Sequence, residues 1–437
     1  MTETRAETVP VSPQDEPESR PGGVPLYIWV LLGAALAIPV GLYWQEKAAG
    51  LDLVSKLIIR ALRALAAPLV VLAILHAIVS NDIRGRQGFR MMIYYLINTL
   101  VAMGIGLGLT NLIKPGLGVE FAEIGSAQKE LPKKSVTDLI LELIPESIGE
   151  AFAQNNLAQL VLLTLALGIG LAKIRNEQIA RGETTYRVAV DLLALGFELL
   201  MRVLLWIVAL VPLAVFGIIA SSVGQKEGMQ VFQALIWLVV VVVAGLACQN
   251  VWYLIVLFLF RGMSPLRFLR GALDVMASTF STSSTAATMP ITLKALTGKL
   301  GVSRESSQLA ACIGTNFNND GTALYQATAA LFMAQAMGYT LGPIDQLIVV
   351  VTTLVASVGA GGIPSGSFVT LPLIFASVGL PADKIPVLLT IDWFLDRCRT
   401  TSNVLGDMTV AVLLDRTAGP RPPRESGVEE GEPAAVL

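Results

Sequence analysis

Six long apolar stretches constrain what this chain can fold into. They run approximately over residues 26–45, 51–80, 90–113, 157–174, 190–222 and 229–260. A helix needs roughly 20 apolar residues to cross the hydrocarbon core of a bilayer, and each stretch is close to or above that length. Only 15% of the residues are charged, against about 25% in soluble domains. The sequence therefore predicts an all-α integral membrane protein.

The two ends of the chain differ from this apolar region. Residues 1–25 and 417–437 are rich in Pro, Glu and Ser, so we expect disordered tails around one domain over residues 26–416. Basic groups near Arg84, Arg175 and Arg261 fall in alternate connections. By the positive-inside rule this places the N-terminus in the cytoplasm. We expect a multi-pass protein of the cell (inner) membrane.

Composition also excludes several classes of function. The net charge of -2, with basic residues in short separated groups, argues against a nucleic-acid partner. The three cysteines lie far apart and His76 is the single histidine, which fits neither a disulfide framework nor a zinc or haem enzyme. A membrane-embedded hydrolase lacks support because no G-x-S-x-G surrounds the hydroxyl-rich residues 281–285.

The last third of the chain contains a polar unit that occurs twice. Residues 277–288 (ASTFSTSSTAAT) and 356–372 (ASVGAGGIPSGSFVTLP) are small, hydroxylated and nearly uncharged. Each precedes a polar helix, GTNFNNDGT at 314–322 and DWFLDRCRTTSNVLGD at 392–407. Matched interrupted segments in two halves are typical of secondary transporters. We predict two re-entrant hairpins; the alternative is a pair of external loops.

The second polar helix carries its polar side chains in one stripe. Helical spacing aligns them on one face, which must line a polar cavity because charges at membrane depth are costly. Arg399 is suited to bind a carboxylate and Asp396 an ammonium group, with Asn403 and Thr400 beside them. The alternative is that Asp396 and Arg399 simply pair and hold helices together. The stripe consists of Asp392, Asp396, Arg399, Thr400, Asn403 and Asp407.

The first polar helix is rich in oxygen-bearing side chains. Asn316, Asn318, Asn319 and Asp320 stand together, and glycines at 314 and 321 are expected to let the helix unwind. Carbonyl and carboxylate oxygens of an unwound helix are ligands for Na+ or another hard cation.

Four motifs resemble one known family. They are Ser283-Ser284-Thr285-Ala286-Ala287-Thr288-Met289-Pro290, Asn318-Asn319-Asp320-Gly321-Thr322, Gly359-Ala360-Gly361-Gly362-Ile363-Pro364, and residues 392–407. With these, the chain resembles the glutamate transporter family, the dicarboxylate/amino acid:cation symporters. The resemblance covers roughly residues 26–416.

The resemblance implies eight transmembrane helices plus two re-entrant helical hairpins, related as inverted repeats. It implies a homotrimer with a static scaffold, mainly residues 51–80 and 140–222, and a moving transport part, mainly residues 90–113 and 263–416. The activity would be elevator-type transport of an acidic amino acid. The implied substrate residues are Ser283, Thr285, Thr322, Ile363, Ser367, Asp396, Arg399, Thr400 and Asn403.

The same resemblance implies cation sites, and these depart from the family pattern. Asn319 replaces a methionine, Asn316 a threonine, and Asn98 stands where the third helix usually has Thr-Ser. Na+ is therefore the expected coupling cation, with H+ or Ca2+ as alternatives and no organic cofactor; Gln326 argues against potassium counter-transport. The implied cation residues are Tyr95, Asn98, Thr99, Gly314, Asn316, Asn318, Asn319, Asp320, Ser357, Asn403 and Asp407.

Three other functions remain open from the sequence. The chain could be a C4-dicarboxylate carrier, a Na+-independent amino acid transporter influenced by H+ or Ca2+, or a channel-like member. By the resemblance, Arg399 favours an acidic over a neutral amino acid, and Asp396 favours an amino acid over a plain C4-dicarboxylate.

Overall fold

The computed structural model describes residues 26–80, 85–117, 144–154, 157–223, 228–360, 367–381 and 385–415. These residues are mainly helical, with no β-strand among them. The elements are α1 (Leu26–Trp44), η2 (Gln45–Leu51), α2 (Asp52–Ser80), α3 (Gly85–Ile113), α5 (Ile148–Ala153), α6 (Leu157–Ala180), α7 (Tyr186–Val208), α8 (Val211–Val223), α9 (Gly228–Arg261), α10 (Pro265–Thr282), α11 (Thr285–Lys294), the π-helical η3 (Ala295–Leu300), α12 (Arg304–Phe317), α13 (Asp320–Ala336), α14 (Pro343–Ala360), α15 (Ser367–Ser377) and α16 (Ile385–Leu414).

Five helical stretches of the described chain are long and apolar enough to cross a membrane. Shorter apolar helices occur at Ile28–Trp44 and Pro343–Ser357. Five of the six predicted stretches thus coincide with a spanning helix, and the first coincides with the shorter α1. The protein is an α-helical, multi-pass membrane protein. The five long stretches are Leu53–His76, Gln87–Ile113, Gln159–Ala180, Tyr186–Ser221 and Gln233–Arg261.

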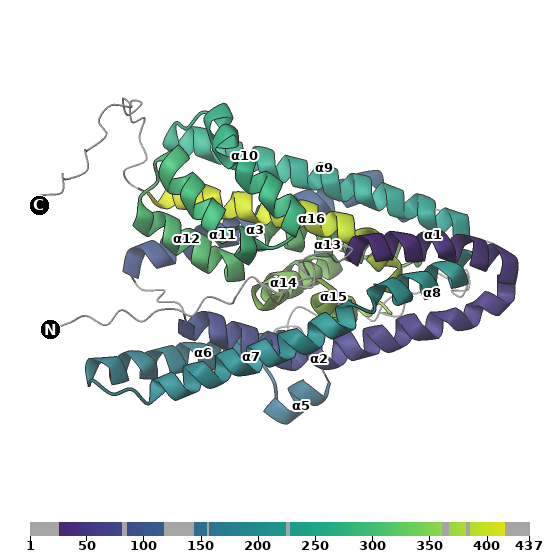
Figure 1. Cartoon of the computed structure of the whole chain (residues 1–437), viewed down its shortest axis with the longest axis horizontal. Coiled ribbons are helices and arrows are strands. Elements are labelled where there is room, and N and C mark those ends of the chain that lie inside the picture. The colour runs from purple at the N-terminus through teal and green to yellow at the C-terminus, as the bar shows by residue number, and fades with distance from the viewer. Residues whose placement is uncertain are drawn as a thin grey trace, which may run out of the picture.

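The helices divide into two groups with α13, α14 and α15 between them. In Figure 1, α2, α6 and α7 lie along one side of the molecule and α9 to α12 and α16 along the other. The central α13 packs closely on α3 at Gly106. A Cβ added to Gly106 would lie 2.7 Å from Thr328 Oγ1 and 2.9 Å from Leu324 O, so only glycine fits there. Nearly every residue of α13 is buried. A charge at the start of α13 is therefore shielded from both water and lipid.

The serine-rich segment forms the turn of a helical hairpin. Helix α10 ends at Thr282, Ser283 takes a left-handed conformation with φ 53°, and α11 begins at Thr285. Ser284 caps α11 by accepting a hydrogen bond from the Ala287 amide at 3.2 Å. Helices α14 and α15 also pack against each other. The described parts of both segments are helical apart from Ser283 and Ser284, so they are not extended loops; residues 361–366, including Ile363, lie outside the described residues.

The first polar helix is interrupted, as predicted, but the break is limited to two asparagines and does not include the neighbouring glycines. Asn318 and Asn319 separate α12 from α13, whereas Gly314 and Gly321 are helical. The prediction that these glycines let the helix unwind is wrong. A Cβ on Gly314 would lie 2.1 Å from Asp407 Oδ1, and one on Gly321 would lie 2.7 Å from the Arg399 carbonyl oxygen. Both glycines allow the uninterrupted α16 to approach closely.

Candidate functional site

Arg399 is the centre of the polar stripe on α16. Its side chain is fully buried and donates from Nη1 to Asp392 Oδ1 and from Nη2 to Asp396 Oδ1, each at 2.7 Å. Its guanidinium carbon lies 4.2 Å from the centre of the Tyr325 ring. The pairing of Asp396 with Arg399, which the sequence analysis gave as an alternative, is therefore present. Asp392 extends this pair to a triad.

This triad still has hydrogen-bonding capacity left. Arg399 Nε and the Tyr325 hydroxyl have no hydrogen-bond partner among the described residues. The Asp396 side chain is 22% exposed, whereas that of Asp392 is 4% exposed. Arg399 therefore keeps one unpaired N–H donor and Asp396 is the more exposed carboxylate, while Asp392 holds the arginine from its buried side.

Asn403 connects α16 to the interruption between α12 and α13. Its Oδ1 accepts from the Gly321 amide at 2.8 Å, and its Nδ2 lies 3.3 Å from Thr322 Oγ1 and 3.5 Å from Asn319 Oδ1. Asn403 lies one turn after Arg399 on α16, and its side-chain amide holds the start of α13 there. Thr400 instead donates to its own helix, to Asp396 O at 2.7 Å.

Arg397, which the sequence analysis did not assign, ties the first hairpin to α16. Its Nη1 lies 3.1 Å from Phe280 O, 2.7 Å from Ser281 O and 3.1 Å from Ser283 Oγ. This guanidinium binds the carbonyl groups at the end of α10 and fixes the turn at Ser283. Thr285, half-buried, begins the next helix. The sequence signal that could have identified Arg397 is a second charged residue beside Asp396 at membrane depth.

A second polar region lies between α3, α9, α13 and α16. Asp320 is completely buried and Asp407 is 3% exposed, and neither forms an ion pair with a described basic residue. Thr99 Oγ1 and the Tyr253 hydroxyl each lie 2.6 Å from one oxygen of Asp320. Burying an uncompensated carboxylate costs several kcal/mol, of order that of a broken buried ion pair. The two carboxylates therefore lack a compensating positive charge among the described residues.

Asn318 joins this region to Asp407 and leaves one oxygen free. Its Nδ2 donates to Asp407 Oδ1 at 2.8 Å and to the Asn403 carbonyl at 2.9 Å. Its Oδ1 is buried and has no described partner. The approach distances at Gly314 place the Tyr95 hydroxyl beside Asp407, and that hydroxyl donates to Ala310 O at 2.8 Å. Free amide and carboxylate oxygens in one buried place fit a hard cation.

The three unusual asparagines have separate environments. Asn98 Oδ1 accepts from Trp252 Nε1 at 3.1 Å, so its carbonyl faces α9, and its Nδ2 has no described partner. Asn319 Nδ2 donates to the Ser357 carbonyl of α14 at 2.9 Å. Asn316 is half-buried, and its side chain has no hydrogen bond to a described residue. The structure therefore places Asn319 between α16 and α14, and it uses the oxygen of Asn98 in a hydrogen bond to Trp252.

The second hairpin contributes one described residue to the predicted substrate set. Ser367 begins α15 and is 2% exposed. Its carbonyl lies 3.3 Å from Thr370 Oγ1, and Gln326 Nε2 of α13 donates to the same hydroxyl. This contact ties α15 to α13.

Buried charges on a helix within a bundle of spanning helices are typical of membrane transporters. Residues 26–417 match the model of the sodium:dicarboxylate symporter family, and the chain belongs to that family. It is 30% identical to the human neutral amino acid transporter B(0) over 428 residues, covering 88% of this chain and 77% of that protein. It is 29% identical to mouse excitatory amino acid transporter 4 over 444 residues, covering 86% and 78%.

Proposed function

We propose that this protein is a secondary active transporter that moves an acidic amino acid, aspartate or glutamate, with a coupled cation. The observation that carries the proposal is the buried Arg399, which keeps one N–H free between two aspartates. Arg399 would bind the side-chain carboxylate and Asp396 the ammonium group. Asn403, Thr322 and the turn at Ser283 would bind the main-chain carboxylate.

The choice of an acidic substrate rests on charge. The similar proteins include one whose name specifies neutral amino acids and one whose name specifies excitatory amino acids. A neutral amino acid offers Arg399 no second carboxylate, so the guanidinium would stay paired only within the protein. An acidic amino acid brings the carboxylate for which a planar, buried guanidinium is suited.

The coupling to a cation rests on the sum of buried charges. Asp320, Asp392, Asp396 and Asp407 oppose Arg397 and Arg399, which leaves an excess of two negative charges in and around the site. An acidic amino acid adds one more net negative charge. Cations that bind at Asp320 and Asp407 would offset this charge, so substrate and cation would each favour binding of the other. Na+ is the proposed cation, in agreement with the family description.

Alternating access would follow the elevator arrangement that the family resemblance implies. One hydrophobic core draws its buried members from α3, α9, α10, η3, α12, α16 and the short connections between them, with none from α1, α2 or α6 to α8. The other core joins buried residues of α13, α14 and α15 to those of α1, α2 and α6 to α8. The proposed transport part is residues 90–113 and 263–416, to which α9 is attached, and it would move against a scaffold of 51–80 and 140–222. The eight spans, the two re-entrant hairpins, a cytoplasmic N-terminus and the homotrimer belong to the same proposal.

Uptake into liposomes tests the function. Purified protein would be reconstituted and supplied with radiolabelled aspartate or glutamate under a Na+, H+ or Ca2+ gradient, one at a time. We expect saturable uptake that requires inward Na+ and is competed by unlabelled aspartate more strongly than by succinate or serine. Equal competition by succinate would support a C4-dicarboxylate carrier. Conductance without saturable uptake would contradict a transporter, and uptake indifferent to Na+ would reject sodium coupling.

A further inference from the structure

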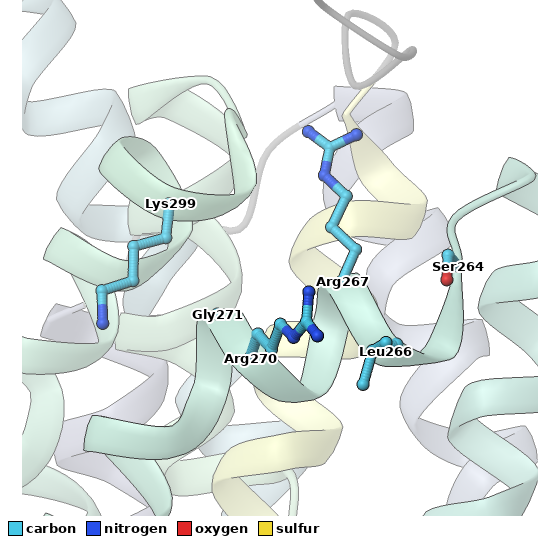
Figure 2. A pocket seen from close by; sticks show the side chains of 6 residues that line it. All are labelled: Ser264, Leu266, Arg267, Arg270, Gly271 and Lys299. Atoms are coloured by element: carbon cyan, nitrogen blue, oxygen red, sulfur yellow. The ribbon is translucent and has the colours of Figure 1, made fainter. Parts of the chain in front are cut away.

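We infer that a basic recess at the start of α10 binds the phosphate headgroup of an anionic phospholipid. The recess has a volume of about 520 Å³ and is lined by Ser264, Leu266, Arg267, Arg270, Gly271 and Lys299. Figure 2 shows Arg267 and Arg270 on the first turns of α10, with Lys299 on a neighbouring helical segment. This place is remote in sequence from the stripe on α16, and nothing in the proposed transport reaction uses it.

The recess has an excess of positive charge. Lys299 pairs with Asp274 at 2.5 Å, whereas Arg267 and Arg270 form no ion pair with a described carboxylate. Arg267 Nη2 lies 3.4 Å from Leu300 O, which leaves its other donors for a ligand. Guanidinium groups bind phosphate oxygens in bidentate fashion.

The backbone adds donors at the same place. Ser264 precedes α10 without a side-chain capping hydrogen bond, and Pro265 occupies the first position of this helix of 18 residues. The amides of Leu266 and Arg267 therefore stand at an uncapped helix N-terminus, which favours an anion. Close packing of Gly271 against Leu300, where a Cβ would meet Leu300 Cδ2 at 2.5 Å, holds η3 and its Lys299 beside these donors.

The surroundings identify the anion as a lipid. The spanning stretch of α9 ends at Arg261, so the recess lies at the boundary between hydrocarbon and headgroups. Phe260 and Leu266 on either side of the connection are 73% and 55% exposed. A phospholipid can place its phosphate in the recess and its acyl chains along these apolar side chains. Basic pockets between helices at this depth are suited to anionic headgroups.

Native mass spectrometry of the full-length protein in detergent tests this site. Dioleoyl-phosphatidylglycerol and dioleoyl-phosphatidylcholine would be titrated separately into the wild type and Arg267→Gln/Arg270→Gln. We expect the wild type to retain phosphatidylglycerol preferentially. We expect the affinity of the double variant for phosphatidylglycerol to fall by a factor of about five for each arginine removed. If the double variant does not fold, the single variant Arg270→Gln, at an exposed position, takes its place. We expect its affinity for phosphatidylglycerol to be about fivefold lower than that of the wild type.

The matched control is Lys294→Gln/Arg304→Gln. These two exposed residues flank η3 without lining the recess, so the control removes the same charge from the same end of the molecule. We expect less than about a twofold change. Equal losses in both double variants would assign the preference to general surface charge and overturn the site. Unchanged retention in Arg267→Gln/Arg270→Gln would overturn it as well.

Inorganic phosphate separates a lipid from a soluble anion. It would be titrated into the wild type and the recess variant by calorimetry, and added in excess to the lipid-bound protein. We expect no displacement of phosphatidylglycerol, because phosphate alone lacks the apolar contact with Phe260 and Leu266. Phosphate binding that depends on Arg267 and Arg270, together with lipid retention that does not, would reject the lipid.

Discussion

The two polar regions of this molecule compensate their buried charges in different ways. Around Arg399 each buried charge has a partner, since both aspartates contact the guanidinium at 2.7 Å. Around Asp320 and Asp407 the partners are neutral hydroxyl and amide groups, and one amide oxygen of Asn318 is left over. The carboxylates of the first region are thus compensated by a charged partner, whereas those of the second have no described one. This contrast is the basis on which we propose substrate recognition for the first region and coupling for the second.

Replacing Arg399 is expected to have the largest effect on substrate binding. Arg399→Ala leaves the buried Asp392 and the partly exposed Asp396 without their charged partner and removes the group that would bind the substrate carboxylate. We expect aspartate affinity to fall by about 3 kcal/mol or more, at least a hundredfold. Calorimetric titration of purified protein measures this loss.

The control for that variant restores the charge balance. Asp392→Asn combined with Arg399→Ala removes one of the two uncompensated charges, so we expect it to recover thermal stability without recovering aspartate affinity. Unchanged aspartate affinity in folded Arg399→Ala would reject the assignment of Arg399.

Asp396→Asn sharpens the assignment of the substrate class. Asp396 is the more exposed of the two aspartates around Arg399, and its proposed partner is the ammonium group of the substrate. We expect aspartate to bind about 2 kcal/mol more weakly and succinate, which has no ammonium, to change little. Competition of both ligands against labelled substrate gives the two values.

Asp392→Asn is the matched variant for Asp396→Asn. Asp392 is buried behind the arginine, so its loss should weaken aspartate and succinate by equal factors. If Asp396→Asn also weakens both ligands equally, Asp396 only positions Arg399 and the proposed ammonium contact is wrong.

Asp407→Asn tests the second region. The substitution keeps the shape of the side chain and its contact with Asn318 while removing one of two uncompensated charges. We expect the half-saturating Na+ concentration for aspartate uptake to rise about tenfold, the effect of roughly 1.4 kcal/mol. Asp274→Asn, at a side chain that is 67% exposed, should leave it unchanged. Equal Na+ dependence in wild type and Asp407→Asn would remove Asp407 from the coupling site.

Sequence reasoning reached the elements of both regions because their signals are local. Charges at fixed helical spacing predicted the stripe on α16, and small hydroxylated residues predicted a hairpin at Ser283. The role of Gly314 was missed because it depends on how closely α16 approaches α12. The orientation of Asn98 was missed for the same reason, since it is set by Trp252, 154 residues away in sequence.

Residues that touch the site from apolar helices are the hardest to predict. Tyr253 lies within the spanning stretch Gln233–Arg261, where no charge pattern marks it. Tyr325 follows the Asn318–Thr322 motif, but nothing in its spacing relates it to Arg399. Both tyrosines matter because the fold brings Tyr253 to Asp320 and Tyr325 to Arg399. Residue spacing in the sequence does not predict these contacts.

Tyr253→Phe is expected to have the smallest effect, and it distinguishes two meanings of the contact with Asp320. The Tyr253 hydroxyl stabilises the carboxylate when no cation is bound, so its loss should lower the melting temperature without Na+ by roughly 2 °C. Among the described residues Asp320 then has only Thr99 as a donor, and the added stability on saturating with Na+ should be larger than in the wild type. Tyr94→Phe, at a half-buried position on α3, is the control. A smaller Na+ response in Tyr253→Phe would mean that the hydroxyl oxygen is itself a cation ligand, and that the second region is a preformed cage.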